Sequence, residues 1–399
     1  MIARDQYLQK LLDFRETKLI KVVTGIRRCG KSTLFQIYQQ YLLQHGVAAE
    51  QIIALNFEDL AYEELLDYRK LYQYVTERLL PDKMNYIFLD EIQAVAQFQK
   101  VADSLYIQPN VDLYLTGSNA YLLSGEIATL LSGRYVEIAM LPLSFQEYVS
   151  AQPEQTNLPA LYTQYLQTSS FPGALELKTR SKIREYLAGI YNTIVLKDII
   201  ARYKIQDVTL LESVIRFMFD NIGNFCSSRK IAGALSAQGR KISANTVERY
   251  LAAMTDSYIL YKAGRYDLKG KQYLTTGEKY YLADLGLRHY LLGEKAVDLG
   301  HVLENVVYLE LRRRGYEVFI GKVGAAEVDF IAVGETETAY FQVALTVREQ
   351  MTLQRELAPL KQINDHHQKY LLTLDEDPPQ SYDGIRQLNA LQWLMKTAE

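Results

Sequence analysis

One stretch decides the fold of the N-terminal part of the chain: Gly25-Ile26-Arg27-Arg28-Cys29-Gly30-Lys31-Ser32-Thr33. Its spacing is G-x-x-x-x-G-K-[ST], and it lies between an apolar run at residues 20–23 and a helical pattern through Tyr38. In such a loop the two glycines let consecutive N–H groups point at phosphate oxygens, and the following helix presents its positive end. A basic glycine-rich turn without a ligand is the alternative. The flanking strand and helix favour a phosphate-binding loop, so we predict that all nine residues contact a nucleotide.

Two side chains of this loop have the chemistry that a nucleotide with Mg²⁺ needs. Lys31 is long enough to reach the β- and γ-phosphates, and Ser32 offers a hydroxyl oxygen, which Mg²⁺ accepts as a ligand. We therefore predict ATP and Mg²⁺ as cofactors. The sequence holds no base-reading motif such as N-K-x-D, so the residues alone leave ATP and GTP open.

A second run, Tyr86-Ile87-Phe88-Leu89-Asp90-Glu91, is an apolar strand pattern that ends in two carboxylates. Side chains alternate along a strand, so the two carboxylates point to different sides. Asp90 is predicted to hold the Mg²⁺ shell and Glu91 to orient and polarise the attacking water. Without the upstream loop, the same pair would indicate only a solvated helix start.

Two further positions are candidates for contact with the γ-phosphate. The apolar run 113–116 ends in Gly117-Ser118-Asn119, and we predict Asn119 as the sensor with Ser118 second; an ordinary turn is the alternative. Arg134 precedes the apolar run 135–139 and is predicted to act as an arginine finger. A finger acting in trans requires a homo-oligomer, and the alternative is an arginine that satisfies a sheet edge.

The bulk composition places limits on the rest. The 399 residues suggest about two to four domains, and the net charge of -3 gives no global attraction to nucleic acid or to anionic membranes. The two cysteines have no metal-site or disulfide spacing, and no apolar run approaches the ~18 residues of a membrane span. We expect a cytoplasmic protein with no membrane partner.

Short apolar runs alternate with helical patterns through the first third of the chain, which predicts an α/β fold with a parallel sheet and helices on both faces. The predicted strands are Leu19–Thr24, Gln51–Asn56, Asn85–Asp90, Asp112–Thr116 and Tyr135–Ala139. We predict a P-loop NTPase core over residues 1–145, a helical lid or connector over 146–205, a winged helix over 206–290 and a separate small α/β module over 291–399.

The order of motifs resembles one family of proteins. The motifs are Thr24 to Thr33, Asn56-Phe57-Glu58-Asp59, Phe88-Leu89-Asp90-Glu91-Ile92-Gln93, Thr116-Gly117-Ser118, Gly133-Arg134 and Leu141-Pro142-Leu143-Ser144-Phe145. This order is similar to that of prokaryotic AAA+-like ATPases with a C-terminal domain of unknown function resembling the PD-(D/E)XK nuclease fold. The resemblance implies ATP as the nucleotide, a core with an additional strand and a catalytic Glu, a winged helix and a nuclease-like tail. One departure is Ser169-Ser170, where relatives often have glycines, and it puts the connector geometry in doubt.

The middle of the chain carries a basic segment. Residues 228–271 hold nine basic and three acidic residues, a local charge of +6 in a chain of -3. Such a surface would give salt-sensitive phosphate contacts, with base contacts from Asn245, Thr246 and Arg249. The predicted nucleic-acid contacts are Arg240, Lys241, Arg249, Lys262, Arg265, Lys269 and Lys271. Winged helices also serve as lids or protein docks, so DNA binding and protein binding both stay open.

The tail has an incomplete nuclease pattern. Glu304 lies on a helical pattern over 301–313, and Asp329 lies on a strand pattern followed by a second one. An active member would hold Mg²⁺ with Asp and Glu-x-Lys, but Gln342 and Ala344 occupy the Glu and Lys positions here. We predict that Glu304, Asp329 and Gln342 form a vestigial site without nuclease activity.

These observations give one leading hypothesis and two alternatives. The leading one is an ATPase whose cycle moves the winged-helix and nuclease-like half, on DNA. The first alternative is a nucleotide-gated binding module with little turnover. The second is an ATP-powered, metal-dependent nuclease. The protein partner and the pathway are not encoded in any motif.

Overall fold

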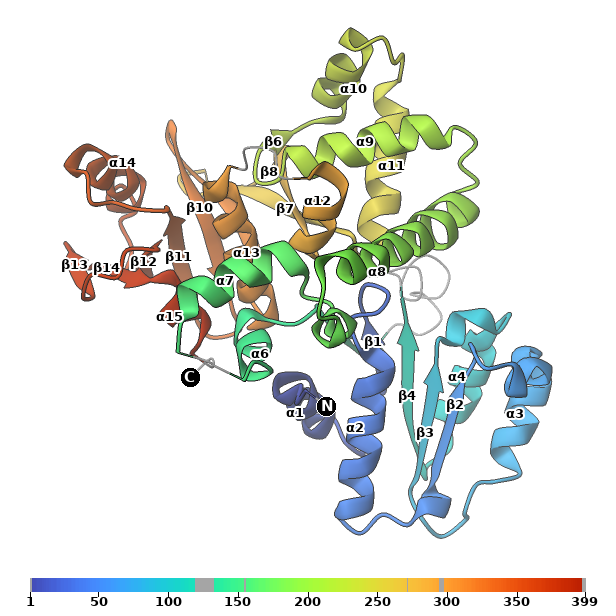
Figure 1. The fold of residues 1–399 in the computed structure, drawn as a ribbon. Helices are drawn as coiled ribbons and strands as arrows, with labels where there is room; N and C mark the ends of the chain where they lie inside the picture. The colour runs from blue at the N-terminus through green and yellow to red at the C-terminus, as the bar shows by residue number, and fades with distance from the viewer. Residues whose placement is uncertain (1, 119–132, 154–155, 271, 294–297, 397–399) are drawn as a thin grey trace. The chain divides into compact units, whose positions relative to one another are not determined.

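The computed structural model describes residues 2–118, 133–153, 156–270, 272–293 and 298–396. The chain divides into two compact units, Met1–Pro142 with Asp256–Tyr258, and Leu143–Thr255 with Ile259–Glu399. Figure 1 shows the sheet of the first unit in blue and cyan and the sheet of the second in yellow to red. Each unit is described by itself. Among the helices that the structure describes, none is both long and apolar enough to cross a membrane.

The first unit is built on a five-stranded parallel sheet with the order β2-β3-β4-β1-β5. The strands are β1 (Ile20–Thr24), β2 (Ile52–Asn56), β3 (Asn85–Asp90), β4 (Val111–Gly117) and β5 (Tyr135–Ala139). All five predicted strands are present, with ends that differ from the prediction by at most one residue. β4 lies between β1 and β3, which is the additional strand that the resemblance implies.

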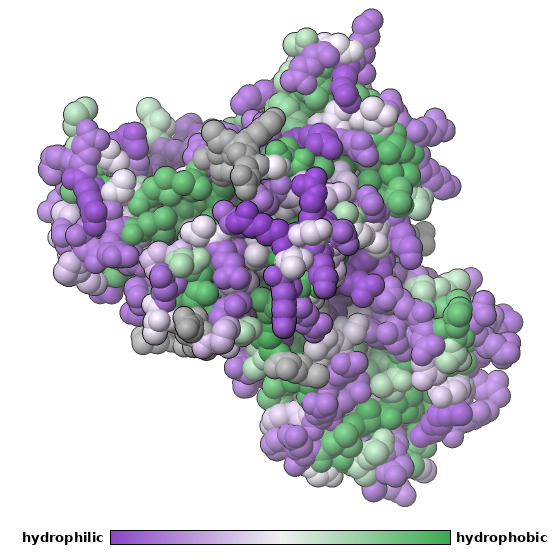
Figure 2. Space-filling view, viewed as in Figure 1, coloured by the Kyte–Doolittle hydropathy of each residue, from purple (hydrophilic) through white to green (hydrophobic). Residues whose placement is uncertain are grey.

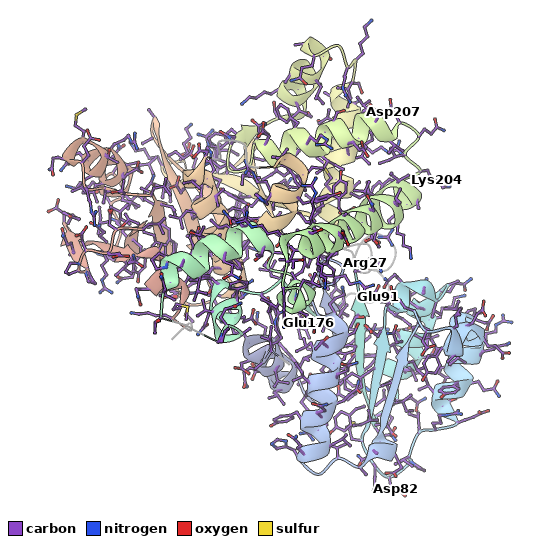
Figure 3. All side chains as sticks on the ribbon, in the orientation of Figure 1. Arg27, Asp82, Glu91, Glu176, Lys204 and Asp207 are labelled. Atoms are coloured by element: carbon purple, nitrogen blue, oxygen red, sulfur yellow. The ribbon has the colours of Figure 1, made fainter. Side chains whose placement is uncertain are left out.

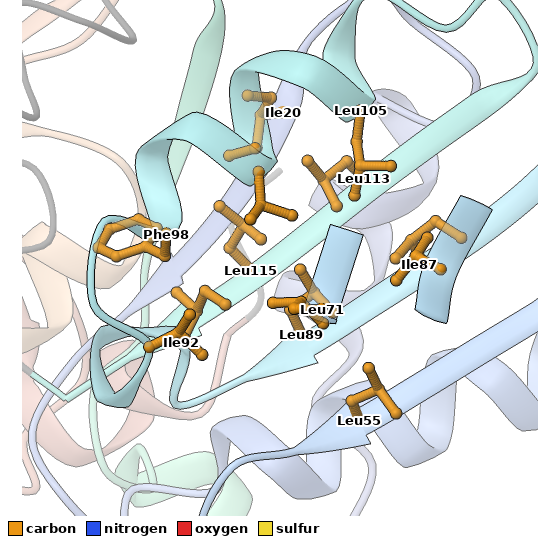
Figure 4. Close-up of a cluster of buried hydrophobic side chains, with 14 of the residues drawn as sticks. Ile20, Leu55, Leu71, Ile87, Leu89, Ile92, Phe98, Leu105, Leu113 and Leu115 are labelled. Carbon is orange, nitrogen blue, oxygen red and sulfur yellow. The ribbon is translucent and has the colours of Figure 1, made fainter. Parts of the chain in front are cut away.

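Helices cover both faces of this sheet, as predicted. On one face, α3 (Tyr68–Thr76) and α4 (Phe98–Tyr106) pack on a core of aliphatic side chains such as Ile87, Leu89 and Leu115, shown in Figure 4. On the other face, α2 (Lys31–Gln44) packs its rings on β3 and β4, and α1 (Asp5–Asp13) packs on α2. Neighbouring strand residues therefore pack into opposite cores, which explains why β3 is buried throughout. The short 3₁₀ turns are η1 (Ala49–Gln51), η2 (Leu60–Leu66) and η3 (Ile92–Ala94).

A buried ion pair ties β1 to β4 in this unit. The ammonium of Lys21 donates to the carboxylate of Asp112, and both side chains are almost fully buried. The other Asp112 oxygen accepts a 2.6 Å hydrogen bond from Tyr114, whose hydroxyl is 2.9 Å from that of Tyr38. Every charged or polar tip in this cluster thus has a partner, as burial requires.

The second unit begins with the helices predicted for the connector. They are α6 (Phe145–Ser150), α7 (Leu158–Thr168), the 3₁₀ turn η5 (Pro172–Glu176), α8 (Arg180–Thr193) and the π-helix η6 (Ile194–Ala201). Three helices then precede a hairpin: α9 (Val208–Asp220), α10 (Ser228–Ala237) and α11 (Ala244–Asp256), followed by β7 (Leu260–Asp267) and β8 (Gln272–Leu282). This order of elements is compatible with the predicted winged helix, which stays a prediction.

The C-terminal elements complete a nine-stranded sheet with the order β13-β14-β12-β11-β10-β9-β7-β8-β6. Its remaining strands are β6 (Phe225–Cys226), β9 (Glu317–Val323), β10 (Ala326–Val333), β11 (Thr338–Val343), β12 (Gln368–Thr373), β13 (Gln380–Tyr382) and β14 (Ile385–Asn389). The helices of this part are α12 (Leu285–Leu292), α13 (Leu299–Arg313), α14 (Gln350–Lys361) and α15 (Ala390–Leu394). The helical pattern over 301–313 falls within α13, and the two predicted strand patterns are β10, which holds Asp329, and β11.

The sheet differs from the expectation of a separate C-terminal module. The free edge of β7 pairs in parallel with β9, with Arg265, Tyr266 and Asp267 opposite residues 320–322. The hairpin therefore shares one sheet with the tail. The physical reason is that an unpaired strand edge gains backbone hydrogen bonds when another strand covers it, and periodicity within one segment carries no information about such a partner.

The two serines that depart from the family pattern have a structural role in the second unit. α7 ends at Thr168, and the Ser169 and Ser170 hydroxyls donate to the buried Asp284 carboxylate at 3.0 and 2.7 Å. The Ser170 N–H donates to the same oxygen at 2.6 Å. Burial raises the pKa of Asp284, and these donors oppose that rise. Two glycines would supply no hydroxyl donor to this carboxylate.

Candidate nucleotide site

The loop between β1 and α2 has the backbone conformation that its two glycines allow. Gly25 has φ 143°, and a Cβ there would lie 2.1 Å from the carbonyl oxygen of Met140. Gly30 has φ 105° and caps α2, which begins at Lys31. Both values lie in the region that residues with a side chain rarely adopt, so the glycines of the pattern are required by geometry.

The N-terminus of α2 and the Lys31 ammonium face the inside of this loop. The first N–H groups of a helix have no acceptor within the helix, and they carry its positive partial charge, which favours a phosphate. Lys31 is buried, and its Nζ donates to the carbonyl of Gly25 at 3.1 Å. The same Nζ lies 3.7 Å from Oε1 of Glu91. The loop and the end of β3 therefore share one cation.

Asp90 lies at the end of β3 among hydroxyl groups. It is nearly buried, and it is hydrogen-bonded to the Ser32 hydroxyl of α2 and to the Thr116 hydroxyl of β4. Burial raises the pKa of Asp90, and the hydrogen bonds from the two hydroxyls oppose that rise. A hydroxyl and a carboxylate oxygen beside an anion-binding loop are hard donors of the kind that Mg²⁺ prefers. Ser32 and Asp90 therefore fit a Mg²⁺ that arrives with a nucleotide.

Glu91 has an unusual backbone and a crowded carboxylate. Its φ and ψ of 53° and 44° are left-handed, and its N–H donates to the Thr116 hydroxyl at 2.8 Å. Its carboxylate accepts a hydrogen bond from Nε2 of Gln93 and lies beside Lys31. A non-glycine residue in this conformation costs about 1–3 kcal/mol and is common at functional sites. The turn thus aims the carboxylate of Glu91 toward the loop.

Three residues at the site received no role from the sequence. Thr116 joins Asp90 to Glu91, and Gln93 contacts the Glu91 carboxylate. Both lie in quoted motifs, which was the only signal available. Arg4 lies far upstream, and its guanidinium donates to the carbonyl of Cys29 at 3.0 Å and to that of Leu141 at 2.6 Å. No local pattern marks such a long-range support of the loop.

The Asn56-Phe57-Glu58-Asp59 motif, which begins at the last residue of β2, also contacts the loop. Arg27 and Glu58 form an ion pair with 2.8 Å between Nη1 and Oε1. Figure 3 shows Arg27 and Glu91 at one end of the five-stranded sheet and Asp82 at the opposite end. The motif residues thus gather at the carboxyl ends of the parallel strands, where ligands bind in open α/β sheets.

The chain is similar to two known domain families and to proteins of two organisms. Residues 17–149 match the model of an AAA domain, and residues 159–298 match a domain of unknown function, DUF8612. An uncharacterized protein of Haemophilus influenzae is 40% identical over 400 residues, covering 99% of both chains. The chain belongs to this family of AAA-domain proteins. The uncharacterized protein MJ1544 of Methanocaldococcus jannaschii is 30% identical over 342 residues, covering 80% of this chain and 73% of that protein.

Solved structures with a related arrangement are more distant from this AAA-domain protein. The Walker-type ATPase PABY2304 of Pyrococcus abyssi has a TM-score of 0.47 and 16% identity, covering 73% of this chain and 96% of that one. The ORC1 protein of Aeropyrum pernix in complex with DNA has a TM-score of 0.33 and 14% identity, covering 74% and 93%.

The candidate γ-phosphate residues of the AAA domain have different surroundings. Asn119 lies outside the described residues. Ser118 is buried, with its hydroxyl 3.4 Å from Nε2 of Gln93. Arg134 forms an ion pair with Asp103 of α4, and its guanidinium lies 5.5 Å from the ring centre of Tyr106. This is the arrangement of the alternative interpretation, an arginine with a partner in its own unit, and the finger role stays a prediction.

Several predicted nucleic-acid contacts of the second unit interact with the protein itself. Arg240 donates to the Thr209 carbonyl at 3.2 Å, Arg249 donates to the Tyr203 carbonyl, and Lys262 pairs with Glu278 at 2.9 Å. The guanidinium of Arg265 lies 4.8 Å from the Phe225 ring centre. Asn245 and Thr246 lie at the start of α11, and Ser243 accepts a hydrogen bond from the Thr246 N–H at 3.1 Å, as expected of a cap. Lys241 and Lys269 are exposed, and Lys271 lies outside the described residues.

The tail brings its predicted residues together and adds a lysine. The Asp329 N–H donates to the Gln342 side chain at 3.4 Å, and Glu304 lies close enough to influence the pKa of Asp329. Burial and then Glu304 raise that pKa well above its usual value. Lys279 of β8 pairs with Glu304 at 3.0 Å and with Glu327 at 2.8 Å. Among the residues that the structure describes, no group of three His, Cys, Asp or Glu side chains could hold a metal ion.

Proposed function

We propose that the chain hydrolyses ATP at the site formed by the loop after β1 and the ends of β3 and β4. The observation that carries the proposal is the joint position of Lys31, Asp90 and Glu91: one cation and two carboxylates with separate partners. Ser32 and Asp90 would hold Mg²⁺, which neutralises charge on the phosphates when it is bound. Glu91 would orient a water molecule and accept its proton, and Lys31 would stabilise charge on the transferred phosphoryl group.

Phosphate release measured with ATP and Mg²⁺ tests this proposal. Turnover should vanish in Lys31→Ala, because the loop loses its only lysine. In Glu91→Gln, turnover should fall steeply while ATP binding is kept, because the amide cannot accept the proton. Equal turnover in Glu91→Gln and in the unchanged protein would overturn the assignment of the base.

A nucleotide-gated module with little turnover is the second candidate, and one observation favours it. The Glu91 carboxylate is already engaged by the Lys31 ammonium and the Gln93 amide. A carboxylate engaged by two donors is less free to hold an attacking water molecule. ATP that binds tightly with turnover far below the ~1 s⁻¹ of slow enzymes would identify this module, and faster turnover would exclude it.

We further propose that the nucleotide cycle moves the second unit and that the second unit acts on DNA. We retain residues 145, 205 and 290 as the proposed domain boundaries, although the parts on either side of residue 290 share one sheet. The support is the order of three helices and a hairpin, together with the net basic charge of residues 228–271. DNA-stimulated turnover that fades as salt rises tests the link, because phosphate contacts are salt-dependent.

The nuclease alternative has little support in the tail. Lys279 occupies two of its carboxylates, and Ala344 stands at the lysine position. Cutting of DNA that needs Mn²⁺ and is lost in Asp329→Ala would support the nuclease alternative.

If Arg134 acts in trans, the protein must form a homo-oligomer. Light scattering with and without ATP tests this.

A further inference from the structure

A cavity of about 670 Å³ opens on the nine-stranded sheet of the second unit. Strands β7 to β11 and the turn after α14 line it, and no residue of the nucleotide site takes part. Its size lies within the ~300–1,000 Å³ of small-ligand sites. Figure 2 shows hydrophobic residues as several patches among hydrophilic ones on the drawn face, so exposed apolar surface alone would not single out this cavity.

Three aromatic rings form one wall of the cavity. Tyr266 and Tyr273 face each other across the β7–β8 hairpin, with ring centres 5.2 Å apart. Phe319 of β9 lies 5.2 Å from Tyr273 and 6.3 Å from Tyr266. Tyr273 is 67% exposed, so its ring is accessible to a ligand in the cavity. The wall therefore offers an open aromatic face.

The rim supplies a cation next to that wall. Lys269 lies at the tip of the same hairpin and is exposed, and its main-chain N–H donates to Asp267 at 3.0 Å. A Cβ atom on Gly324 would lie 3.3 Å from Nζ of Lys269. Because glycine has no Cβ, the ammonium has room there. Asp365 also lines the cavity, and its carboxylate accepts a 2.6 Å hydrogen bond from Tyr340. The cavity thus combines a stacking surface with an ammonium and a carboxylate.

We propose that this cavity takes an unpaired base of a single-stranded nucleic acid, with the base on Tyr273 and its phosphate against Lys269. Every base has a π-face that stacks on an aromatic ring, and an ammonium is a partner for the adjoining phosphate. A base inside a duplex is already stacked and cannot enter. The proposal rests on the nucleic-acid part of the proposed function and not on ATP turnover. A free nucleotide also carries a base and a phosphate, so the test must distinguish a free nucleotide from a single strand.

The test measures fluorescence anisotropy of a fluorescein-labelled 20-mer of deoxythymidine with the full chain, without ATP, over a salt series. Tyr273→Ala should weaken binding about 5- to 150-fold, which corresponds to ~1–3 kcal/mol for one stacked base, and Tyr273→Phe should keep most of the affinity. Lys269→Gln should reduce the salt slope by about 0.7, the value for one phosphate of a single strand.

Two variants serve as matched controls. Met351→Ala removes a side chain of the same unit that is 79% exposed and lies outside the cavity, and Lys178→Gln removes an exposed lysine. Neither should change the affinity or the salt slope. An equal loss of affinity in these controls and in Tyr273→Ala would overturn the proposal.

Photochemical crosslinking locates the base directly. An oligonucleotide with 5-iodouracil should crosslink to the peptides that contain Tyr273 or Phe319, as mass spectrometry can show. Unchanged affinity in Tyr273→Ala, crosslinks confined to other peptides, or equal binding of a 20-bp duplex would each overturn the proposal. If thymidine monophosphate competed equally well at the same concentration of bases, the ligand would be a free nucleotide and not a single strand. If the chain showed no ATP turnover, the ATPase proposal would be wrong, but the proposal for this cavity would be unaffected.

Discussion

The Thr116 hydroxyl is the sharpest place to test the nucleotide site, because it connects both carboxylates. It donates to Asp90 and accepts the Glu91 N–H at 2.8 Å. Thr116→Val keeps the shape and removes both hydrogen bonds. The buried N–H left without a partner costs ~1–3 kcal/mol, and the lost bond to a charged group costs ~1.5–3 kcal/mol. Since the two losses share one site and do not add in full, we expect a decrease of about 2–5 kcal/mol in unfolding free energy.

Thermal unfolding measures this change, and Thr116→Ser is the matched control. At ~2–4 °C per kcal/mol, the valine variant should unfold roughly 5–15 °C lower. The serine variant loses only a methyl group, worth about 1 kcal/mol, and keeps both hydrogen bonds. If valine and serine unfolded at the same temperature, the two bonds would not contribute as argued.

The same variant has a pH signature that a loss of packing would not produce. Burial raises the pKa of Asp90, and the Thr116 donor opposes this, so Thr116→Val should raise the pKa further. Asp90 has a pKa of ~3.9 in the unfolded chain and a higher one in the folded chain, so its contribution to stability falls as pH rises between these two values. In the valine variant the folded pKa is higher still, so the fall in stability continues to higher pH. Mg²⁺ needs the ionised carboxylate, so the pH midpoint of Mg²⁺-supported ATP binding should also move upward. An unchanged midpoint would refute this account of Asp90.

Other perturbations have equally specific outcomes. Gly25→Ala should abolish ATP binding in calorimetry, because its Cβ would meet a carbonyl oxygen at 2.1 Å; Gly46→Ala, with a similar positive φ of 89° and no neighbour within 4 Å, should leave binding unchanged. Gln93→Leu should raise basal phosphate release up to about tenfold, since it frees the Glu91 carboxylate from a charge-assisted bond of ~1.5 kcal/mol; a decrease would mean that Gln93 assists the reaction. Asp112→Ala should lower the unfolding free energy in urea by ~3–5 kcal/mol, because it leaves the Lys21 ammonium buried without its partner, and the double variant Lys21→Met/Asp112→Leu should recover most of it.

Local patterns were sufficient for the parts of the fold that depend on local physics. The five strands of the first unit are short apolar runs between turns, and the glycines at 25 and 30 are required by their backbone angles. Asp90 could be proposed for the metal because it ends an apolar strand pattern downstream of a phosphate-binding loop. Thr116 could not be assigned, because its role follows from β4 lying between β1 and β3, and strand order is a tertiary property.

The same limit explains what the sequence could not predict in the second unit. Lys279 lies 25 residues before Glu304 in a different element, so no spacing rule relates it to the nuclease pattern. The pairing of β7 with β9 likewise joins segments that are about 50 residues apart. The wall of Tyr266, Tyr273 and Phe319 exists only because of that pairing. A cavity between strands from two predicted domains had no signature in either of them.

The two carboxylate clusters of the chain differ in what neutralises them, and this difference separates their functions. In the first unit, Asp90 is held mainly by hydroxyls, and a hydroxyl and a carboxylate can both become ligands of an arriving cation. In the tail, Lys279 supplies a permanent cation to Glu304 and Glu327. Burial alone would lower the pKa of Lys279, but the carboxylates, Glu304 first, raise it above its usual value, so this cation is retained at neutral pH. A divalent ion would have to displace a paired ammonium there. This difference supports our proposals that Mg²⁺ binds in the first unit and that the aromatic cavity of the second unit binds a ligand.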